Sequence, residues 1–254
     1  MQNYSNTLKT KDGSFSFYSE KYNDFYHSTK DGAILETFCK HIIPTFYIAN
    51  KQHLKILDIC FGLGYNALFS LAYARRFHKH ITIHSVELDL LERLRKFSYP
   101  MFLYRYLPVE KIIESLFDVG FWKGENVSIY LHKGDAKIYL ESLVKQSHLF
   151  DIIYQDAFSP SKNADLWSEE HFKNLFLLLN NNGVISTYSS NKKVREICQK
   201  CGFDIYNMQS GNLKNGTIFY KSTKPLHLPY SHFLQSGLVE SILFECVKLT
   251  KIKT

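Results

Sequence analysis

The sequence predicts an α/β protein in which a parallel sheet is covered by helices on both faces. Two observations carry this prediction: strand-like and helical segments alternate along most of the chain, and a glycine-rich turn joins the first strand-like run of that alternation to the helix after it. Alternation of this kind is typical of parallel sheets, because each helix returns the chain to the edge where the next strand begins. A glycine-rich turn also lets a ligand approach the backbone closely.

Hydrophobic runs and turn signals set the expected elements. Strands are expected at residues 55–60, 81–88, 127–132, 149–154 and 184–189. Helices are expected at residues 65–78, 136–146, 168–180 and 191–201. The run Asn180-Asn-Asn-Gly183 is interpreted as a helix end. Two final runs, 203–208 and 217–221, are expected to form a hairpin, and the whole order is typical of a Rossmann-like fold.

The remaining segments divide the chain into an N-terminal extension, a central domain with an insert, and a tail. Residues 1–50 are expected to form a hairpin followed by a helix from about residue 31. The central domain covers residues 51–222 and contains an insert of short helices at about 90–126, a natural place for substrate recognition. The tail, 223–254, has a periodic apolar stretch near 238–249 that predicts a short helix.

Composition excludes several classes of protein. Hydrophobic residues make up 45% of the 254 residues, which is enough for a core, and no apolar run reaches the length of a membrane span. The N-terminus lacks the regions of a signal peptide, so a cytoplasmic location and no membrane partner are expected. The cysteines and histidines are scattered without metal-ligand spacing, so no metal is expected, and Cys198-Gln-Lys-Cys201 is interpreted as two packed thiols.

A net charge of +7 makes a polyanionic partner plausible, because neutralised phosphates release counterions. A basic surface that only serves solubility fits the charge equally well. Much of the excess lies in two groups outside the strands of the central sheet: Arg93, Arg95, Lys96, Arg105 and Lys111, and then Lys192, Lys193 and Arg195.

The turn after the first central strand predicts a nucleotide-type site. Asp58 ends the strand, Gly62 and Gly64 follow, and the next strand ends at Glu87, about 20 residues on, where a carboxylate suits a ribose diol. Asp58 would repel a pyrophosphate, whereas S-adenosylmethionine carries positive charge and no phosphate. The sequence therefore favours S-adenosylmethionine over a dinucleotide, although a turn that binds nothing remains possible.

A second polar segment follows the strand at 149–154. Asp156 lies at the strand end, where ligands sit in open α/β sheets, and is expected to be functional. Phe158 and Pro160 are candidates for apolar walls, and Asn163 offers hydrogen-bonding groups. Trp167 fits a wall as well, but a role in packing suits it better than base stacking.

The run Gln155-Asp-Ala-Phe-Ser-Pro-Ser-Lys-Asn-Ala-Asp-Leu-Trp167 resembles the D-G-F-x-P-x-K-N-P-x-x-W signature of the MnmC methyltransferase domain. Further similarity lies in Asp12-Gly-Ser, in Tyr18 to Ser28, in Phe61-Gly-Leu-Gly-Tyr-Asn66, in Thr187-Tyr-Ser-Ser and in Val194-Arg195, so that it spans about residues 10–222. The sequence departs from the family pattern at five positions, where the family usually has another residue: Cys60, Leu63, Ala157, Ala164 and Lys192.

The resemblance implies a Rossmann-like class I S-adenosylmethionine-dependent methyltransferase that N-methylates 5-aminomethyl-(2-thio)uridine at wobble position 34, in the anticodon loop of tRNA. It implies the stand-alone version without the flavin-dependent domain, so a separate enzyme would supply the aminomethyl group. Asp156 would be catalytic. The cofactor would be held by Asp58, Phe61, Gly62, Gly64, Asn66, Glu87, Asp135, Ala136 and Asp156. The substrate would be held by Tyr26, Phe158, Pro160, Lys162, Asn163, Trp167, Lys192, Lys193 and Arg195.

Three alternatives stay open at this point. The fold also suits a methyltransferase acting on a small-molecule amine or an aminopropyltransferase-like enzyme. A tRNA-binding module with a vestigial cofactor fold and a dinucleotide-dependent oxidoreductase are the other two.

Overall fold

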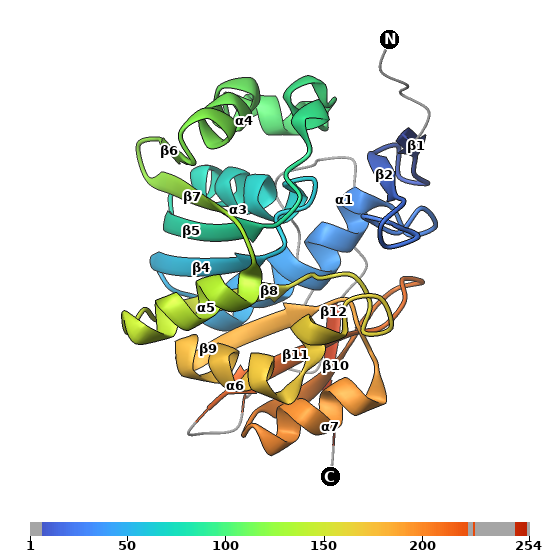
Figure 1. Ribbon diagram of the computed structural model, residues 1–254, viewed down its shortest axis with the longest axis vertical. Helices are drawn as coiled ribbons and strands as arrows, with labels where there is room; N and C mark the ends of the chain where they lie inside the picture. Colours follow the sequence, from blue (N-terminus) through green and yellow to red (C-terminus); the bar gives the residue numbers. More distant parts are fainter. Residues whose placement is uncertain (1–6, 223–225, 227–246, 253–254) are drawn as a thin grey trace.

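A nine-stranded mixed sheet forms the centre of the computed structural model, which describes residues 7–222, 226 and 247–252 (Figure 1). Its strands are, in chain order, β4 (His53–Ile59), β5 (His80–Glu87), β6 (Phe121–Lys123), β7 (Val127–Lys133), β8 (Phe150–Gln155), β9 (Leu179–Thr187), β10 (Asp204–Ser210), β11 (Gly216–Lys221) and β12 (Val247–Lys251). Their spatial order is β12-β10-β11-β9-β8-β4-β5-β7-β6. The five strands from β9 to β7 are parallel neighbours, which confirms the predicted α/β fold.

Helices cover both faces because successive side chains of a buried strand point in opposite directions. Ile56 of β4 belongs to the core beneath α3 (Tyr65–Arg76) and α2 (Ile43–Ala49), whereas its neighbour Leu57 belongs to the core beneath α5 (Ala136–Lys145), α6 (Glu169–Leu178) and α7 (Lys192–Lys200). Figure 1 shows α5, α6 and α7 together on the near side of the sheet. Residues 56–59 of β4 and all of β8 are therefore buried.

The N-terminal extension forms a small sheet and a helical segment with a wide turn. The sheet has three strands, β1 (Thr7–Lys9), β2 (Phe15–Ser19) and β3 (Asp24–Phe25), where a two-stranded hairpin was expected. The helical segment runs through α1 (Ala33–Glu36), the π-helical turn η1 (Thr37–Ile42) and α2.

Pro44, in the first turn of α2, explains the wide turn. A proline has no N–H to donate to the carbonyl four residues earlier, here that of Lys40, and its ring would clash with that carbonyl in a regular helix. The π-helical turn absorbs this conflict by spreading one extra residue over the turn. Its residues, from Thr37 to Ile42, are all buried against the central domain.

The insert contains short helices, as expected, and one strand that was not expected. The helices are η2 (Glu92–Lys96), η3 (Met101–Arg105) and α4 (Val109–Asp118), and β6 then pairs antiparallel with β7. Arg95 forms ion pairs with Glu92 and Asp118. Part of the basic character seen in the sequence is therefore neutralised within the insert.

Two expected elements differ in the structure. The run Asn180-Asn-Asn-Gly183 lies inside β9, because the chain goes directly from α6 into the strand at Leu179 and the irregular pairing with β8 absorbs the asparagines. Residues 247–249, expected in a short helix, belong to strand β12, while 238–246 lie outside the described residues. Among the described helices, none has the length and apolar character needed to cross a bilayer.

Candidate active site

A cavity of about 570 Å³ opens at the carboxyl ends of β4, β5 and β8, where the parallel strands of the sheet end. Its walls come from the glycine-rich loop after β4, the ends of β5 and β8, the start of α5 and the N-terminal extension. This is the edge at which open α/β sheets bind ligands. The predicted site residues that line the cavity are Tyr26, Phe61, Gly62, Asn66, Glu87, Asp135, Ala136, Asp156, Phe158 and Asn163.

The loop after β4 turns sharply and leads into α3. Gly64 has a φ of 77° and precedes the first residue of α3, and a Cβ there would lie 2.7 Å from Cζ of Phe61. Gly62 has a φ of 55°, and the ring of Tyr26 from the N-terminal extension covers it. Both conformations favour glycine. Gly62 therefore lines the cavity, whereas Gly64 does not line it and only allows the loop to turn into α3.

Glu87, at the end of β5, is held by the backbone. Its Oε2 accepts a hydrogen bond from the Gly62 N–H at 2.8 Å, and its Oε1 accepts one from the Asp89 N–H at 2.9 Å. Burial raises the pKa of the Glu87 carboxyl above its ordinary value, and the backbone N–H groups oppose that rise. Each oxygen keeps a second lone pair, so the carboxylate fits a ribose diol.

Asp58 lies beneath this loop and not on the cavity wall, although it was expected among the residues that hold the cofactor. Its side chain is completely buried and accepts a hydrogen bond from Ser85 Oγ at 2.9 Å. Burial raises its pKa to about 8, with the nearby charges of Asp156 and Glu87 adding to the rise. At neutral pH Asp58 is therefore protonated, and it supports the loop from inside.

Asp156 follows β8 and lines the cavity with 15% of its side chain exposed. Its Oδ2 accepts a hydrogen bond from Asn66 Nδ2 at 2.7 Å, and its Oδ1 lies 3.5 Å from His41 Nε2. Burial alone would raise the pKa of Asp156, but the charge and hydrogen bonding of His41, the charge of His27 and the Asn66 amide outweigh it, so the pKa is lowered. The carboxylate is held ionised.

Asn66 leaves one group free for a ligand. Its Nδ2 is bound to Asp156, while its Oδ1 is buried without a hydrogen-bond partner in the part of the chain that the structure describes. An unpaired buried carbonyl is costly, so a donor from a ligand would relieve it. The ammonium of S-adenosylmethionine is such a donor. The residues around the cavity therefore fit this cofactor, and Asp135 and Ala136 at the start of α5 also line the cavity.

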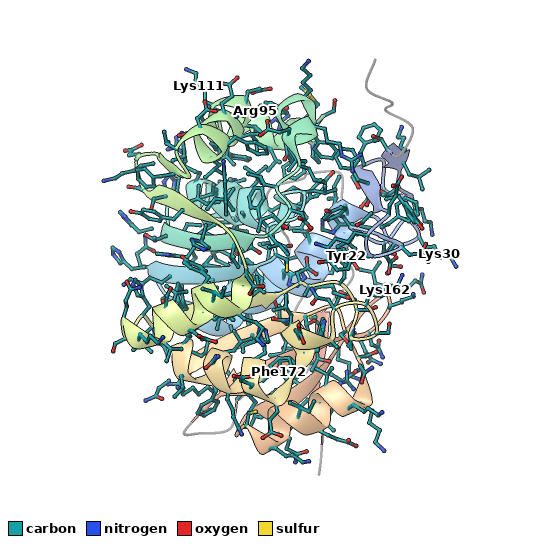
Figure 2. All side chains as sticks on the ribbon, in the orientation of Figure 1. Tyr22, Lys30, Arg95, Lys111, Lys162 and Phe172 are labelled. Atoms are coloured by element: carbon teal, nitrogen blue, oxygen red, sulfur yellow. The ribbon has the colours of Figure 1, made fainter. Side chains whose placement is uncertain are left out.

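The loop after Asp156 is fastened to the N-terminal extension. Phe158 stacks on Tyr22 with ring centroids 4.3 Å apart and meets Tyr26 edge-on at 5.1 Å. Lys162 forms an ion pair with Asp24 at 3.3 Å. Figure 2 shows Tyr22 and Lys162 on the same side of the molecule. Tyr22, Tyr26 and Phe158 all line the cavity, so the two segments together form one part of its wall.

Several predicted substrate residues lie elsewhere. Trp167 is buried and donates its indole N–H to the Phe158 carbonyl, so it packs beneath the loop. Arg195 donates to Thr217 Oγ1, Asn207 Oδ1 and the Gly216 carbonyl, so its guanidinium braces β10 and β11. The others outside the cavity lining are Pro160, Lys162, Lys192 and Lys193.

The basic group in the insert does not reach the cavity either. In Figure 2, Arg95 and Lys111 lie at the top of the view, whereas Lys162 lies at its right side near mid-height. The cavity lining includes none of Arg93, Arg95, Lys96, Arg105 and Lys111. Burial raises the pKa of Tyr26, which lines the cavity, but Arg93 nevertheless lies close enough for its charge to oppose that rise, so a role of the insert in substrate recognition stays a prediction.

Sequence reasoning missed the residues that the helical segment after β3 contributes. Lys40 lines the cavity, and His41 contacts both Asp156 and Ser186, with its Nδ1 2.9 Å from Ser186 Oγ. His27 and Glu36 also line it and lie 3.5 Å apart. The available signal was Pro44, which marks an irregular turn just before it, but nothing local shows that the turn faces the site. In the described residues, no group of histidines, cysteines and acids could hold a metal ion.

Comparisons with known proteins find similarity to S-adenosyl-L-methionine-dependent methyltransferases and to MnmC proteins. Residues 106–219 match the model of a family described as S-adenosyl-L-methionine-dependent methyltransferases. An uncharacterised protein of Methanocaldococcus jannaschii is 28% identical over 85% of this chain and 59% of its own length. The tRNA 5-methylaminomethyl-2-thiouridine biosynthesis bifunctional protein MnmC of Campylobacter hominis is 29% identical over 79% of this chain.

The chain spans only 30% of the length of that MnmC protein. Among solved structures, MnmC2 of Aquifex aeolicus is 27% identical, with a TM-score of 0.76 over 88% of this chain and 72% of that one. Fold, cofactor cavity and sequence similarity thus lead to one conclusion. The fold and the matched region are those of an S-adenosyl-L-methionine-dependent methyltransferase, and the chain is similar to the MnmC protein of C. hominis and to MnmC2 of A. aeolicus.

Proposed function

We propose that the enzyme transfers a methyl group from S-adenosylmethionine to the amine of 5-aminomethyl-(2-thio)uridine at position 34 of tRNA. The observation that carries the proposal is the ionised carboxylate of Asp156 on the wall of a cavity that also fits the cofactor. Support for tRNA comes from the name of the C. hominis relative, a tRNA 5-methylaminomethyl-2-thiouridine biosynthesis protein, and from the similarity to MnmC2. The aminomethyl group itself is supplied by a different active site.

When bound, S-adenosylmethionine supplies a methyl carbon made electrophilic by its sulfonium. Asp156 accepts a hydrogen bond from the substrate amine and so aims the nitrogen lone pair along the line of transfer. The amine becomes positively charged as its bond to carbon forms, and the nearby carboxylate stabilises that charge. Asn66 and His41 fix the two oxygens of the carboxylate, so little reorganisation is needed during the reaction.

The aromatic cluster of Tyr22, Tyr26 and Phe158 contributes rings to the cavity wall. Position 34 lies in the single-stranded anticodon loop, so its base can leave the stack and rest against such faces. Lys162 holds the Phe158 loop against the N-terminal extension through Asp24. The cluster is therefore suited to receive an unstacked uridine, whereas a small amine would leave these faces unused.

Replacement of Asp156 tests the proposal. Asp156→Asn keeps the size of the side chain but removes the negative charge that stabilises the positive charge developing on the amine. The kcat should therefore fall by about 10²- to 10³-fold. The Kd for S-adenosylmethionine should change little, because Glu87 and the glycine loop hold the rest of the cofactor. Steady-state kinetics on tRNA and calorimetry would measure the two quantities. An unchanged kcat would contradict the role of Asp156.

A further inference from the structure

The proposed reaction leaves open where one proton goes. An alkylamine is mostly an ammonium at neutral pH, and an ammonium has no lone pair with which to attack a methyl carbon. Asp156 is a poor acceptor for that proton, because His41, His27 and Asn66 hold its pKa below the ordinary value for an aspartate. The carboxylate is suited to stabilise a positive charge but not to neutralise one. Another group must take the proton.

Most other titratable groups on the cavity wall are also unsuited. Glu36 lies 3.5 Å from His27 and accepts the Ser28 N–H, and its charge and hydrogen bond raise the pKa of His27 despite the opposing effect of burial. Burial raises the pKa values of Cys60, Tyr26 and Tyr188, so each already carries its proton. Cys60, Tyr26 and Tyr188 are therefore poor bases, and His27 is engaged by Glu36.

Lys40 differs from all of these groups. It lines the cavity, yet only 1% of its surface is exposed, and its Nζ donates to the carbonyl of Lys214. Among the described residues, no carboxylate forms an ion pair with it. Gly216 gives its chain room, because a Cβ there would lie 3.2 Å from Lys40 Cδ. A buried ammonium without a counter-charge is costly, so this side chain is suited to the neutral form.

The wide turn η1 brings Lys40 and His41 to the site together. His41 reaches Asp156 and Ser186, while Lys40, one residue before it, lines the cavity toward Lys214. Irregular helical turns of this kind occur frequently at functional sites. The turn therefore places the group that positions the carboxylate and an uncompensated basic group on adjacent residues.

We propose that Lys40, in its neutral form, accepts the proton that the substrate amine loses before methyl transfer. The inference rests on the proposed function. The N–H bond of the substrate ammonium breaks, its electron pair stays on the substrate nitrogen, and the proton forms a new bond to Lys40 Nζ. The nitrogen lone pair then forms the bond to the methyl carbon, and the electrons of the carbon–sulfur bond go to sulfur. Lys40 returns the proton to water once product leaves.

Electrostatics in the cavity support this transfer. Burial lowers the pKa of Lys40, while Cys39, Glu36 and Asp31 act weakly in the opposite direction. Four other lysines line the cavity: Lys214, whose carbonyl accepts the Lys40 hydrogen bond, and Lys21, Lys30 and Lys137. Two ammonium groups in one enclosed cavity repel, so the lysine and the substrate amine favour holding a single proton between them. Both bases are alkylamines, and proton transfer between such similar bases needs little driving force.

The test compares pH profiles of kcat for the full-length enzyme on tRNA that carries 5-aminomethyluridine. Lys40→Met keeps the aliphatic chain and removes the base, so kcat at pH 7 should fall by about 100-fold. The deficit should then shrink by about tenfold for each unit of rising pH, because a growing fraction of substrate is already neutral. Lys40→Gln provides a second uncharged variant, and the Kd for S-adenosylmethionine checks that each variant is folded.

Lys221 offers a matched control, because its ammonium also donates to carbonyls, those of Phe176 and Leu179, away from the cavity. Lys221→Met should follow the wild-type profile at every pH. A Lys40 variant with wild-type kcat, or with a deficit that stays constant across pH, would overturn the inference, since a structural role gives no pH-dependent gap. If the wild-type enzyme transfers no methyl group to this tRNA, the proposed function fails instead.

Discussion

Replacing Asp58 should change how the stability of the protein depends on pH. The carboxyl is fully buried and its pKa is about 8 in the folded protein, whereas an unfolded aspartate has a pKa of about 3.9. Between about pH 5 and about pH 7 the folded state therefore holds one proton more than the unfolded state. Because the pKa of Asp58 is higher in the folded state, its bound proton stabilises the folded protein in acid, and this stabilisation is lost as the pH rises. The free energy of unfolding should fall by about 1.4 kcal/mol per pH unit from this group.

Asp58→Asn keeps the shape and the acceptor for Ser85 Oγ but cannot ionise. The difference in unfolding free energy between variant and wild type should grow by about 2.7 kcal/mol from about pH 5 to about pH 7, in favour of the variant. Urea titrations at three pH values would measure it. Asp118→Asn serves as the control, because that carboxylate is exposed in its ion pair with Arg95. A difference that stays constant with pH would refute the reasoning.

Three further substitutions distinguish residues that stabilise the fold from residues that bind the cofactor or tRNA. Gly64→Ala should cost about 2 kcal/mol or more in unfolding free energy, because its Cβ would meet Phe61 at 2.7 Å and its φ is left-handed; a neutral result in urea titration would contradict the loop geometry. Glu87→Gln should weaken S-adenosylmethionine about tenfold or more by calorimetry, because an amide cannot accept both backbone N–H bonds and still hold the ribose. Arg195→Met should lower the unfolding free energy by about 2 kcal/mol and leave the Kd for tRNA unchanged, since its guanidinium braces β10 and β11; a weaker Kd for tRNA would return Arg195 to the substrate site.

Most of the central sheet is predictable from the sequence because its signals are local. Apolar runs in the sequence predict the ends of β4, β5, β7 and β8 to within two residues. The two glycines of the loop after β4 predict a sharp turn, and in the structure both have a positive φ and Gly62 lines the cavity. The Asn180-Asn-Asn-Gly183 run misleads, because turn-forming residues were taken as a helix end when pairing with β8 and β11 draws them into β9. The pairing with neighbouring strands therefore outweighs the local turn propensity of these residues.

The site is predictable only where a residue follows a strand. Asp156 and Glu87 end β8 and β5, so the rule for open sheets finds them. Lys40 and His41 reach the same cavity from a helical turn more than 100 residues before Asp156 in the chain, and only tertiary packing brings them there. Conversely, Trp167 and Arg195 were predicted to hold substrate because they lie in or near a family motif. Both side chains instead form hydrogen bonds within the protein, Trp167 to the Phe158 carbonyl and Arg195 to Thr217.

The most direct test is methyl transfer itself. Purified protein would be mixed with labelled S-adenosylmethionine and tRNA that bears 5-aminomethyluridine at position 34, in parallel with Asp156→Asn, and the tRNA digested to nucleosides for mass spectrometry. We expect label in 5-methylaminomethyluridine or its 2-thio form, and about 10²-fold less of it with the variant. Bound cofactor with no label in tRNA, or label in a different nucleoside, would contradict the proposed function.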